Sequence, residues 1–228
     1  MNAAFAVIAL ALAAEAPPAS SAPEAAAPPS TVAAAPAPAA TAAPAGTVVV
    51  LETTMGDIVL ELDGQKAPIS TANFLQYARS GHYDGTIFHR VIRGFMIQGG
   101  GMNVSMIEKP TKPSIKNESG NGLSNVRGSI AMARTSDLNS ATSQFYINHA
   151  DNTNLDSAKY AVFGKVTDGM TVVDKIATVS TTSKGPHQNV PVAPVTITKV
   201  RIKYDPKAAA PAAEKPAAAK PEKPAPKK

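Results

Sequence analysis

One segment of this 228-residue sequence, Phe88–Gly101, constrains the fold more than any other. It reads FHRVIRGFMIQGGG, so a basic residue, Arg90, is followed by a strand-like apolar run and then by three consecutive glycines. Successive side chains of a strand point to opposite faces, which predicts that Phe95 and Ile97 share one face and that their neighbours Met96 and Gln98 share the other. No nucleophile with an adjacent base and no metal-ligand spacing accompanies the run. A cationic hydrogen-bond donor beside an apolar surface therefore favours chemistry without bond cleavage.

The rest of the central region reads as short strands with two helices. Residues 47–52 and 57–62 are expected to form a hairpin, and Pro68 opens a helix that ends near Gly81. Further strands are expected at 86–92, 95–100, 129–134, 143–148, 161–167 and about 194–203, with a second helix at about 170–179. The alternation of the last strand changes phase between Ile197 and Val200, which predicts a bulge there. This pattern favours a mainly β fold built as a closed barrel.

Composition divides the chain into four parts. Residues 1–16 contain an apolar run and a small-x-small pattern, Ala11–Ala13, that is typical of a secretory signal. Residues 17–46 hold 14 Ala and 8 Pro, and residues 207–228 form a second Ala/Pro tract with 6 Lys. Such tracts bury too little apolar surface to offset the entropy of ordering, so a disordered linker and a disordered tail are predicted. Residues 47–206 have the mixed composition of one folded domain.

The signal-like run predicts a periplasmic or secreted protein. Because no Lys or Arg precedes it, a cytoplasmic protein with an Ala-rich start is the alternative. The run is shorter than the roughly 20 residues of a membrane span, so no stable span is expected.

Charge and residue types exclude several function classes. The net charge is +5, and the six Lys and two Glu of residues 207–228 supply +4 of it, so nucleic-acid binding is not indicated. That tail could touch an anionic surface or stay solvated. The chain has no cysteine, which excludes thiol chemistry, and its four histidines lack the spacing of a metal site. Neither a metal nor a cofactor is predicted.

Phe88–Gly101 closely resembles the signature of the cyclophilins, the peptidyl-prolyl cis-trans isomerases. Ser129–Arg134, Ser143–Ile147 and Ala161–Val166 resemble three further cyclophilin segments and occur in the same order. The resemblance extends over about 47–204, which is the whole predicted domain. It implies an antiparallel eight-stranded barrel capped by two α-helices.

The resemblance also implies a set of site residues. Arg90 matches the catalytic arginine. The walls of the pocket for the substrate proline match Phe95, Met96, Tyr146 and Leu155, and the positions that contact the substrate backbone or line the groove match Gln98, Ala133, Arg134 and Gln144. His89 precedes the arginine as in the family, and Tyr160 falls where many members have histidine.

Three positions depart from the family pattern. Asn154 stands where the family usually has tryptophan or, in many bacterial members, phenylalanine, which implies weaker cyclosporin binding. Arg134 replaces a common asparagine. Tyr146 replaces phenylalanine, and its hydroxyl needs a hydrogen-bond partner.

The activity implied by the resemblance is isomerisation of X–Pro bonds in proline-containing polypeptides, assisting their folding, by a monomer without cofactor or metal. Rotation about the bond needs no acid–base cycle, only stabilisation of a twisted amide. The alternative is a scaffold or chaperone module that binds prolyl peptides and has weak catalysis, which Asn154 makes conceivable.

Overall fold

The computed structural model describes residues 45–204. The predicted signal, the linker up to residue 44 and the predicted tail lie outside the described residues. The elements in chain order are β1 (Ala45–Thr53), β2 (Gly56–Asp63), α1 (Pro68–Arg79), β3 (Thr86–Ile92), β4 (Met96–Asn103), β5 (Ser129–Met132), β6 (Phe145–Asn148), α2 (Asn154–Ser157), β7 (Val162–Asp168), α3 (Met170–Ala177), β8 (Thr181–Lys184), β9 (His187–Pro191) and β10 (Thr196–Tyr204).

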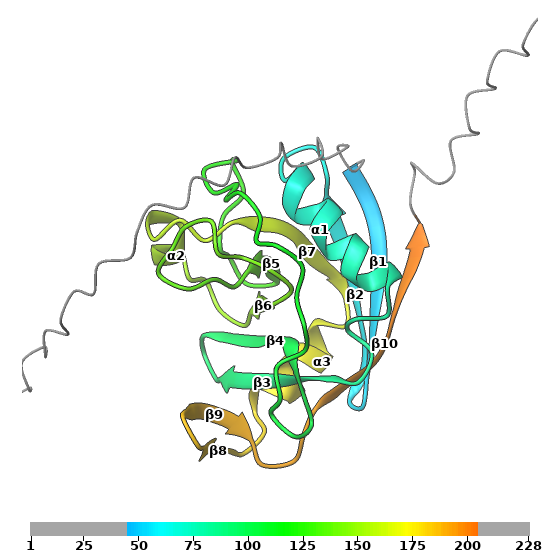
Figure 1. Cartoon of the computed structure of the whole chain (residues 1–228), viewed down its shortest axis with the longest axis vertical. Coiled ribbons are helices and arrows are strands. Elements are labelled where there is room, and N and C mark those ends of the chain that lie inside the picture. Colours follow the sequence, from blue (N-terminus) through cyan, green and yellow to red (C-terminus); the bar gives the residue numbers. More distant parts are fainter. Residues whose placement is uncertain (1–44, 205–228) are drawn as a thin grey trace, which may run out of the picture. The chain divides into compact units, whose positions relative to one another are not determined.

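Eight of these strands close into an antiparallel barrel, in the order β1-β10-β3-β4-β6-β5-β7-β2 (Figure 1). The predicted mainly β barrel is therefore confirmed. The β1–β2 hairpin pairs Val49 with Leu60, and both side chains are fully buried. The helices α1 and α3 complete the core by burying Phe74 and Ile176.

The expected bulge in the last strand is present. Glu52 of β1 pairs with Lys199 of β10, but the next β1 residue, Thr53, pairs with Ile197. Thr198 is thus the extra residue. Because of this bulge, the side chains of Ile197 and Val200 both pack inside the barrel although they are three positions apart.

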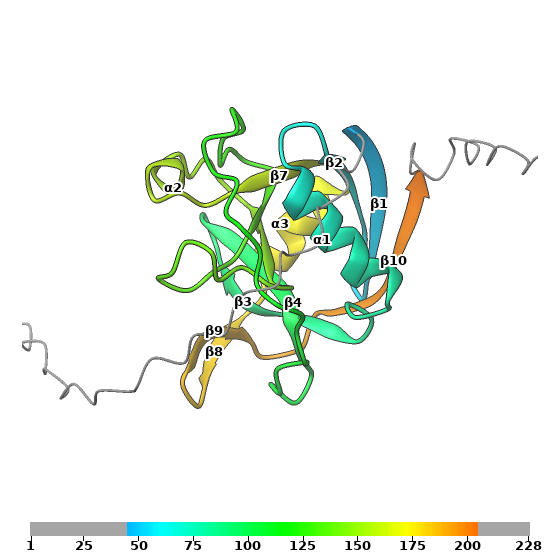
Figure 2. The same cartoon turned by 45° about the horizontal axis from the view of Figure 1, so that its top comes forward.

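Three elements were not predicted. The one-turn helix α2 lies between β6 and β7, and β8 and β9 form a separate two-stranded sheet. Figures 1 and 2 both show this small sheet beside β3, outside the ring of barrel strands. Its residues are mostly polar, so they carry no hydrophobic alternation by which a strand could be recognised.

The apolar residues form two clusters. The larger fills the barrel and includes Ile97. The smaller lies on the outer face and contains Met96 and Tyr146, with Phe95 and Leu155 packed against it. The prediction that Phe95 shares a face with Ile97 is therefore wrong. Strand β4 begins only at Met96, and Phe95 belongs to the preceding turn, where strand alternation does not apply.

No helix within residues 45–204 is both long enough and apolar enough to cross a membrane.

Candidate active site

A bulge in β3 decides which way Arg90 points. Phe88 pairs with Gly99 and Arg90 pairs with Gln98, so two β3 steps oppose one β4 step and His89 is the extra residue. Phe88 and Val91 both pack inside the barrel although they are three residues apart. With regular alternation Arg90 would follow Phe88 inward. The bulge instead places Arg90 on the outer face, level with Gln98.

On this outer face lies a pocket of about 210 Å³. Nine of the eleven site residues expected from the sequence line it together: Arg90, Phe95, Met96, Gln98, Ala133, Arg134, Tyr146, Leu155 and Tyr160. Met96 and Tyr146 are buried at its floor, whereas Arg90 is exposed at its rim. Apolar walls with a charged donor at the edge suit a ligand that is partly apolar and partly amide.

The floor of the pocket rests on buried side-chain amides. The Tyr146 hydroxyl donates to Asn125 Oδ1 at 2.7 Å, which supplies the partner that this hydroxyl was expected to need. Burial raises the pKa of Tyr146 far above its usual value, so the hydroxyl stays protonated. Asn148 donates to the same Asn125 oxygen at 3.1 Å, and Asn152 donates to Asn148 Oδ1 at 2.7 Å and to the Phe95 carbonyl at 2.8 Å.

The same amide network reaches α2, which carries Leu155. The Asp156 carboxylate accepts hydrogen bonds from the Ser124 hydroxyl and from both the backbone and side-chain nitrogens of Asn125. Burial works to raise the pKa of Asp156, but these hydrogen bonds outweigh it and hold the pKa below its ordinary value. A charged Asp156 therefore fixes the short helix against the pocket floor.

A chain of amides lines the rim next to Arg90. Arg90 Nη1 lies 3.5 Å from Gln98 Oε1, Gln98 Nε2 donates to Gln144 Oε1 at 3.0 Å, and Gln144 Nε2 donates to Glu108 Oε1 at 3.2 Å. Gly101 makes room for this arrangement, because a Cβ at that position would lie 2.5 Å from Gln144 Cγ.

Arg134 and Tyr160 form the opposite wall. The Arg134 guanidinium lies 4.4 Å from the centre of the Tyr160 ring and donates to the carbonyls of Thr135, at 2.8 Å, and of Ala158. The Tyr160 ring meets the Tyr146 ring edge to face at 6.0 Å. This cation–π contact and the backbone carbonyls hold Arg134 in place, in contrast to the loosely held Arg90.

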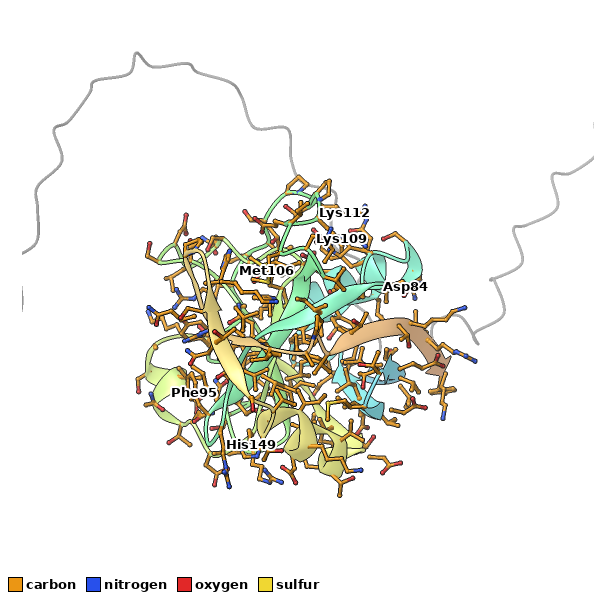
Figure 3. The ribbon with its side chains drawn as sticks, turned by 90° about the horizontal axis from the view of Figure 1, so that it is seen from below. Asp84, Phe95, Met106, Lys109, Lys112 and His149 are labelled. Atoms are coloured by element: carbon orange, nitrogen blue, oxygen red, sulfur yellow. The ribbon has the colours of Figure 1, made fainter. Side chains whose placement is uncertain are left out.

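His149 holds the turn that contains Phe95 through hydrogen bonds. The Gly94 backbone N–H donates to His149 Nδ1 at 3.0 Å, and the His149 backbone N–H donates to the Phe95 carbonyl at 2.9 Å. His149 Nε2 lies 3.2 Å from Asp174 Oδ1, and Asp174 is also paired with Arg127. Figure 3 shows Phe95 and His149 at the same edge of the molecule.

Sequence reasoning missed these supporting residues, Asn125, Asn148, Asn152 and His149 among them. Each lies in a loop or at a strand end and acts on a segment far along the chain, so no local pattern marks it. The three asparagines are buried, which is unusual for this residue type. A prediction of which positions are buried could therefore have drawn attention to them.

Two predicted residues lie beside the pocket, not in it. His89 and Gln144 line an adjoining hollow, and Gln144 also lines another one next to Arg134. Burial, reinforced by the nearby His187, lowers the pKa of His89 to about 4, so this side chain is neutral near pH 7. Asn154 is exposed at the start of α2 and is not among the residues that line the pocket.

Residues 45–204 contain no group of three or more His, Cys, Asp or Glu side chains that could hold a metal ion.

Comparison with known proteins identifies the family. The model of the family "Cyclophilin type peptidyl-prolyl cis-trans isomerase/CLD" matches residues 48–202. Peptidyl-prolyl cis-trans isomerase A of Dickeya dadantii (strain 3937) is 57% identical over 160 residues, covering 68% of this chain and 84% of that protein. Peptidyl-prolyl cis-trans isomerase B of Escherichia coli (strain K12) is 51% identical over 162 residues, covering 68% and 99%.

Solved structures agree with these sequence matches. The crystal structure of a Cryptosporidium parvum cyclophilin type peptidyl-prolyl cis-trans isomerase has a TM-score of 0.60 at 28% identity, covering 70% of this chain and 99% of that one. A crystal structure of the same protein in the presence of the dipeptide Ala-Pro has a TM-score of 0.59 at 28% identity, covering 69% and 99%. The chain therefore belongs to the cyclophilin type peptidyl-prolyl cis-trans isomerase family and is an isomerase of that type.

Proposed function

We propose that Arg90 is the catalytic residue of this isomerase and that the pocket beside it holds the proline ring of the substrate. An X–Pro bond rotates against a barrier of about 18–20 kcal/mol that arises from amide resonance. At the top of the barrier resonance is lost, and the proline nitrogen becomes a hydrogen-bond acceptor. A donor aimed at that nitrogen stabilises the twisted state more than either planar state, which is the requirement for acceleration.

Arg90 has the properties that this role needs. An arginine guanidinium keeps its charge in proteins, so Arg90 donates throughout the rotation without losing a proton. Its one side-chain hydrogen bond that the structure gives, to Gln98, is long at 3.5 Å and leaves other N–H groups free to face the pocket. Arg134 is a poorer candidate, because the Tyr160 ring and three backbone carbonyls already engage its guanidinium.

The pocket walls divide the substrate into two parts. Phe95, Met96 and Leu155 offer apolar surface for the ring of a proline, and Tyr146 closes the floor. Gln98 and Gln144 offer amides for the flanking peptide backbone. The observation that carries the proposal is that these apolar walls and Arg90 line the same cavity, although they come from β3, β4, β6, α2 and the turn before β4.

Arg90→Ala tests the catalytic assignment. Loss of one preorganised donor to a developing charge typically costs a hundred- to a thousandfold in rate, about 2.7–4 kcal/mol. Arg93→Ala is the matched control, because Arg93 is an exposed arginine just three residues along that does not line the pocket. Isomerisation of a prolyl peptide, followed by NMR exchange, should fall only in the first variant, with unchanged melting. An Arg90→Ala protein that melts normally and keeps more than a third of the rate contradicts the assignment.

The same assay separates enzyme from scaffold. A wild-type protein that binds a prolyl peptide but hardly accelerates its exchange would favour the scaffold or chaperone module.

We further infer that the natural substrates are polypeptides that fold outside the cytoplasm, and that the protein acts on them as a monomer. The support for the location is the signal-like run in residues 1–16. Fusion of residues 1–46 to a reporter that is active only after export tests the location. A reporter that stays in the cytoplasm overturns it. Sedimentation of the purified chain tests the monomer, and a stable dimer overturns that inference.

A further inference from the structure

Next to the prolyl pocket lies a second hollow that the proposed mechanism does not use. Its volume is about 390 Å³, and it lies between β3–β4 and the small β8–β9 sheet. His89 and Arg90 of β3 and Gln98 of β4 form one side, and His187, Gln188 and Asn189 of β9 form the other. Arg90 and Gln98 line both cavities, so the hollow continues the groove directly past the catalytic position.

His89 forms part of the wall of this hollow and is only 5% exposed. Its Nδ1 is covered by the surrounding protein and has no hydrogen-bond partner among the described residues, so His89 shapes the wall and does not offer this atom to a ligand. The bulge that turns Arg90 outward also places His89 here, beside the pocket.

The groups around the hollow favour an anionic ligand. Arg90 supplies a permanent positive charge, and the side chains of His187, Gln188 and Asn189 can each donate hydrogen bonds. Within residues 45–204, no acidic residue lines this hollow. The hollow on the other side of Gln144 differs, because Glu108 lines it. Among the described residues, the hollow next to Gln144 and Arg134 thus has a carboxylate in its lining, whereas the hollow between β3 and β9 has none.

We propose that the hollow between β3 and β9 is a substrate subsite that accepts an acidic side chain of the client polypeptide, on one side of its proline only. The inference rests on the proposed prolyl function of the neighbouring pocket. An extended chain advances about 3.3 Å per residue, so a residue two or three positions from the proline reaches a hollow that shares two lining residues with the prolyl pocket. Clients with Asp or Glu at that position are then preferred over clients with Lys.

The test uses the full-length protein and matched peptides. Each peptide has one Ala–Pro bond within alanines and carries either Glu or Lys at a single position, two or three residues before or after the proline. The measurement is kcat/KM by NMR exchange at low ionic strength and at about 0.15 M, because salt screens exposed charges. At one position, on one side of the proline, we expect the Glu peptide to be favoured about threefold, the size typical of a partly exposed charge pair.

Gln188→Glu should abolish or reverse this preference by placing a carboxylate in the hollow. His187→Glu repeats the reversal from the neighbouring position in case the first variant folds poorly, and melting curves establish which variants are folded. Thr182→Glu is the matched control, because Thr182 is exposed on β8 of the same small sheet and does not line the hollow.

The outcomes separate the two proposals. Equal rates for the Glu and Lys peptides at every position overturn the subsite, and so does a Thr182→Glu effect as large as that of Gln188→Glu. Neither result affects the role of Arg90, which depends on the loss of rate that Arg90→Ala shows with the uncharged peptide, in which every residue except the proline is alanine. Loss of the Glu preference in Gln188→Glu but not in Thr182→Glu supports the subsite.

Discussion

The barrel interior and the floor of the prolyl pocket are both buried, but they are held together differently. The interior is almost wholly apolar, with Phe74 lying 5.6 Å from Phe163 and 5.5 Å from Phe145 between ring centres. Under the pocket, Asn125 is equally buried but accepts hydrogen bonds from Tyr146 and Asn148. Apolar contacts have no direction, whereas each of these hydrogen bonds fixes one atom against another.

This difference predicts a separation of effects. Changes in the interior should cost stability with little effect on the pocket, because many neighbours share the packing. Changes under the pocket should cost less stability but disturb substrate binding, since they release the walls. The predictions that follow test this separation, beginning with the largest effect.

Phe163→Ala should lower the free energy of unfolding by about 3–5 kcal/mol, the usual cost of removing a buried aromatic ring. Phe163 is fully buried in the barrel cluster and does not line the prolyl pocket. Urea unfolding measures the loss, and kcat/KM per folded molecule should stay within about twofold of the wild-type value. A large change in kcat/KM at a temperature where the variant is fully folded would show that interior and pocket are coupled.

His89→Gln should flatten the pH dependence of stability. The folded pKa of His89 is about 4, below the roughly 6.5 of an unfolded histidine, so the unfolded chain binds the additional proton between these values. The stability that the neutral, buried His89 contributes is complete above pH 6.5 and is lost as the pH falls towards 4. The difference between the folded and unfolded pKa values of His89 corresponds to roughly 3 kcal/mol of unfolding free energy.

The measurement is the difference in unfolding free energy between wild type and His89→Gln at several pH values. The lowered pKa values of His82 and Asp156 are common to both proteins and cancel in this difference. A difference that stays constant from pH 7 to pH 4.5 would contradict the burial of a neutral His89.

Asn125→Ala should lower the free energy of unfolding by about 2 kcal/mol and raise KM more than it lowers kcat. The substitution leaves the Tyr146 hydroxyl and the Asn148 amide without their shared acceptor, and an unsatisfied buried polar group costs about 1–3 kcal/mol. A double-mutant cycle with Tyr146→Phe should give a coupling energy above about 0.5 kcal/mol. Strict additivity of the two changes would mean that the hydrogen bond contributes nothing to the pocket floor.

The two regions also differ in how far the sequence predicts them. The barrel strands were found because large apolar residues such as Ile58, Leu60 and Leu62 recur at every second position, and all three are fully buried. The phase change in the last strand even located the bulge near Thr198. Elements without an apolar face, such as β8 and β9, gave no such signal, and Phe95 was assigned to the wrong face because the start of β4 was set one residue too early.

The pocket was predicted only through resemblance to a family, not through residue patterns. Its walls come from five separate segments, and no periodicity relates Arg90 to Leu155 or to Tyr160. The residues beneath the pocket are even harder to predict from the sequence. A buried amide such as Asn125 is identified by its partners, and these become neighbours only once the chain has folded.

The smallest effect is expected from removing the side-chain contacts of His149 that hold the turn before β4. His149→Ala removes the acceptor for the Gly94 N–H and the link to Asp174, but it keeps the backbone hydrogen bond to the Phe95 carbonyl. A typical net hydrogen bond contributes about 0.5–1.5 kcal/mol, so the free energy of unfolding should fall by about 1 kcal/mol. The turn then holds Phe95 less firmly, and KM should rise severalfold with kcat almost unchanged, because Arg90 is untouched. Asp174→Ala is the control: it breaks only the outer link, so its effect on KM should be smaller than that of His149→Ala. A fall in kcat with constant KM, or an equal effect of both variants, would mean that His149 supports α3 and not the pocket wall.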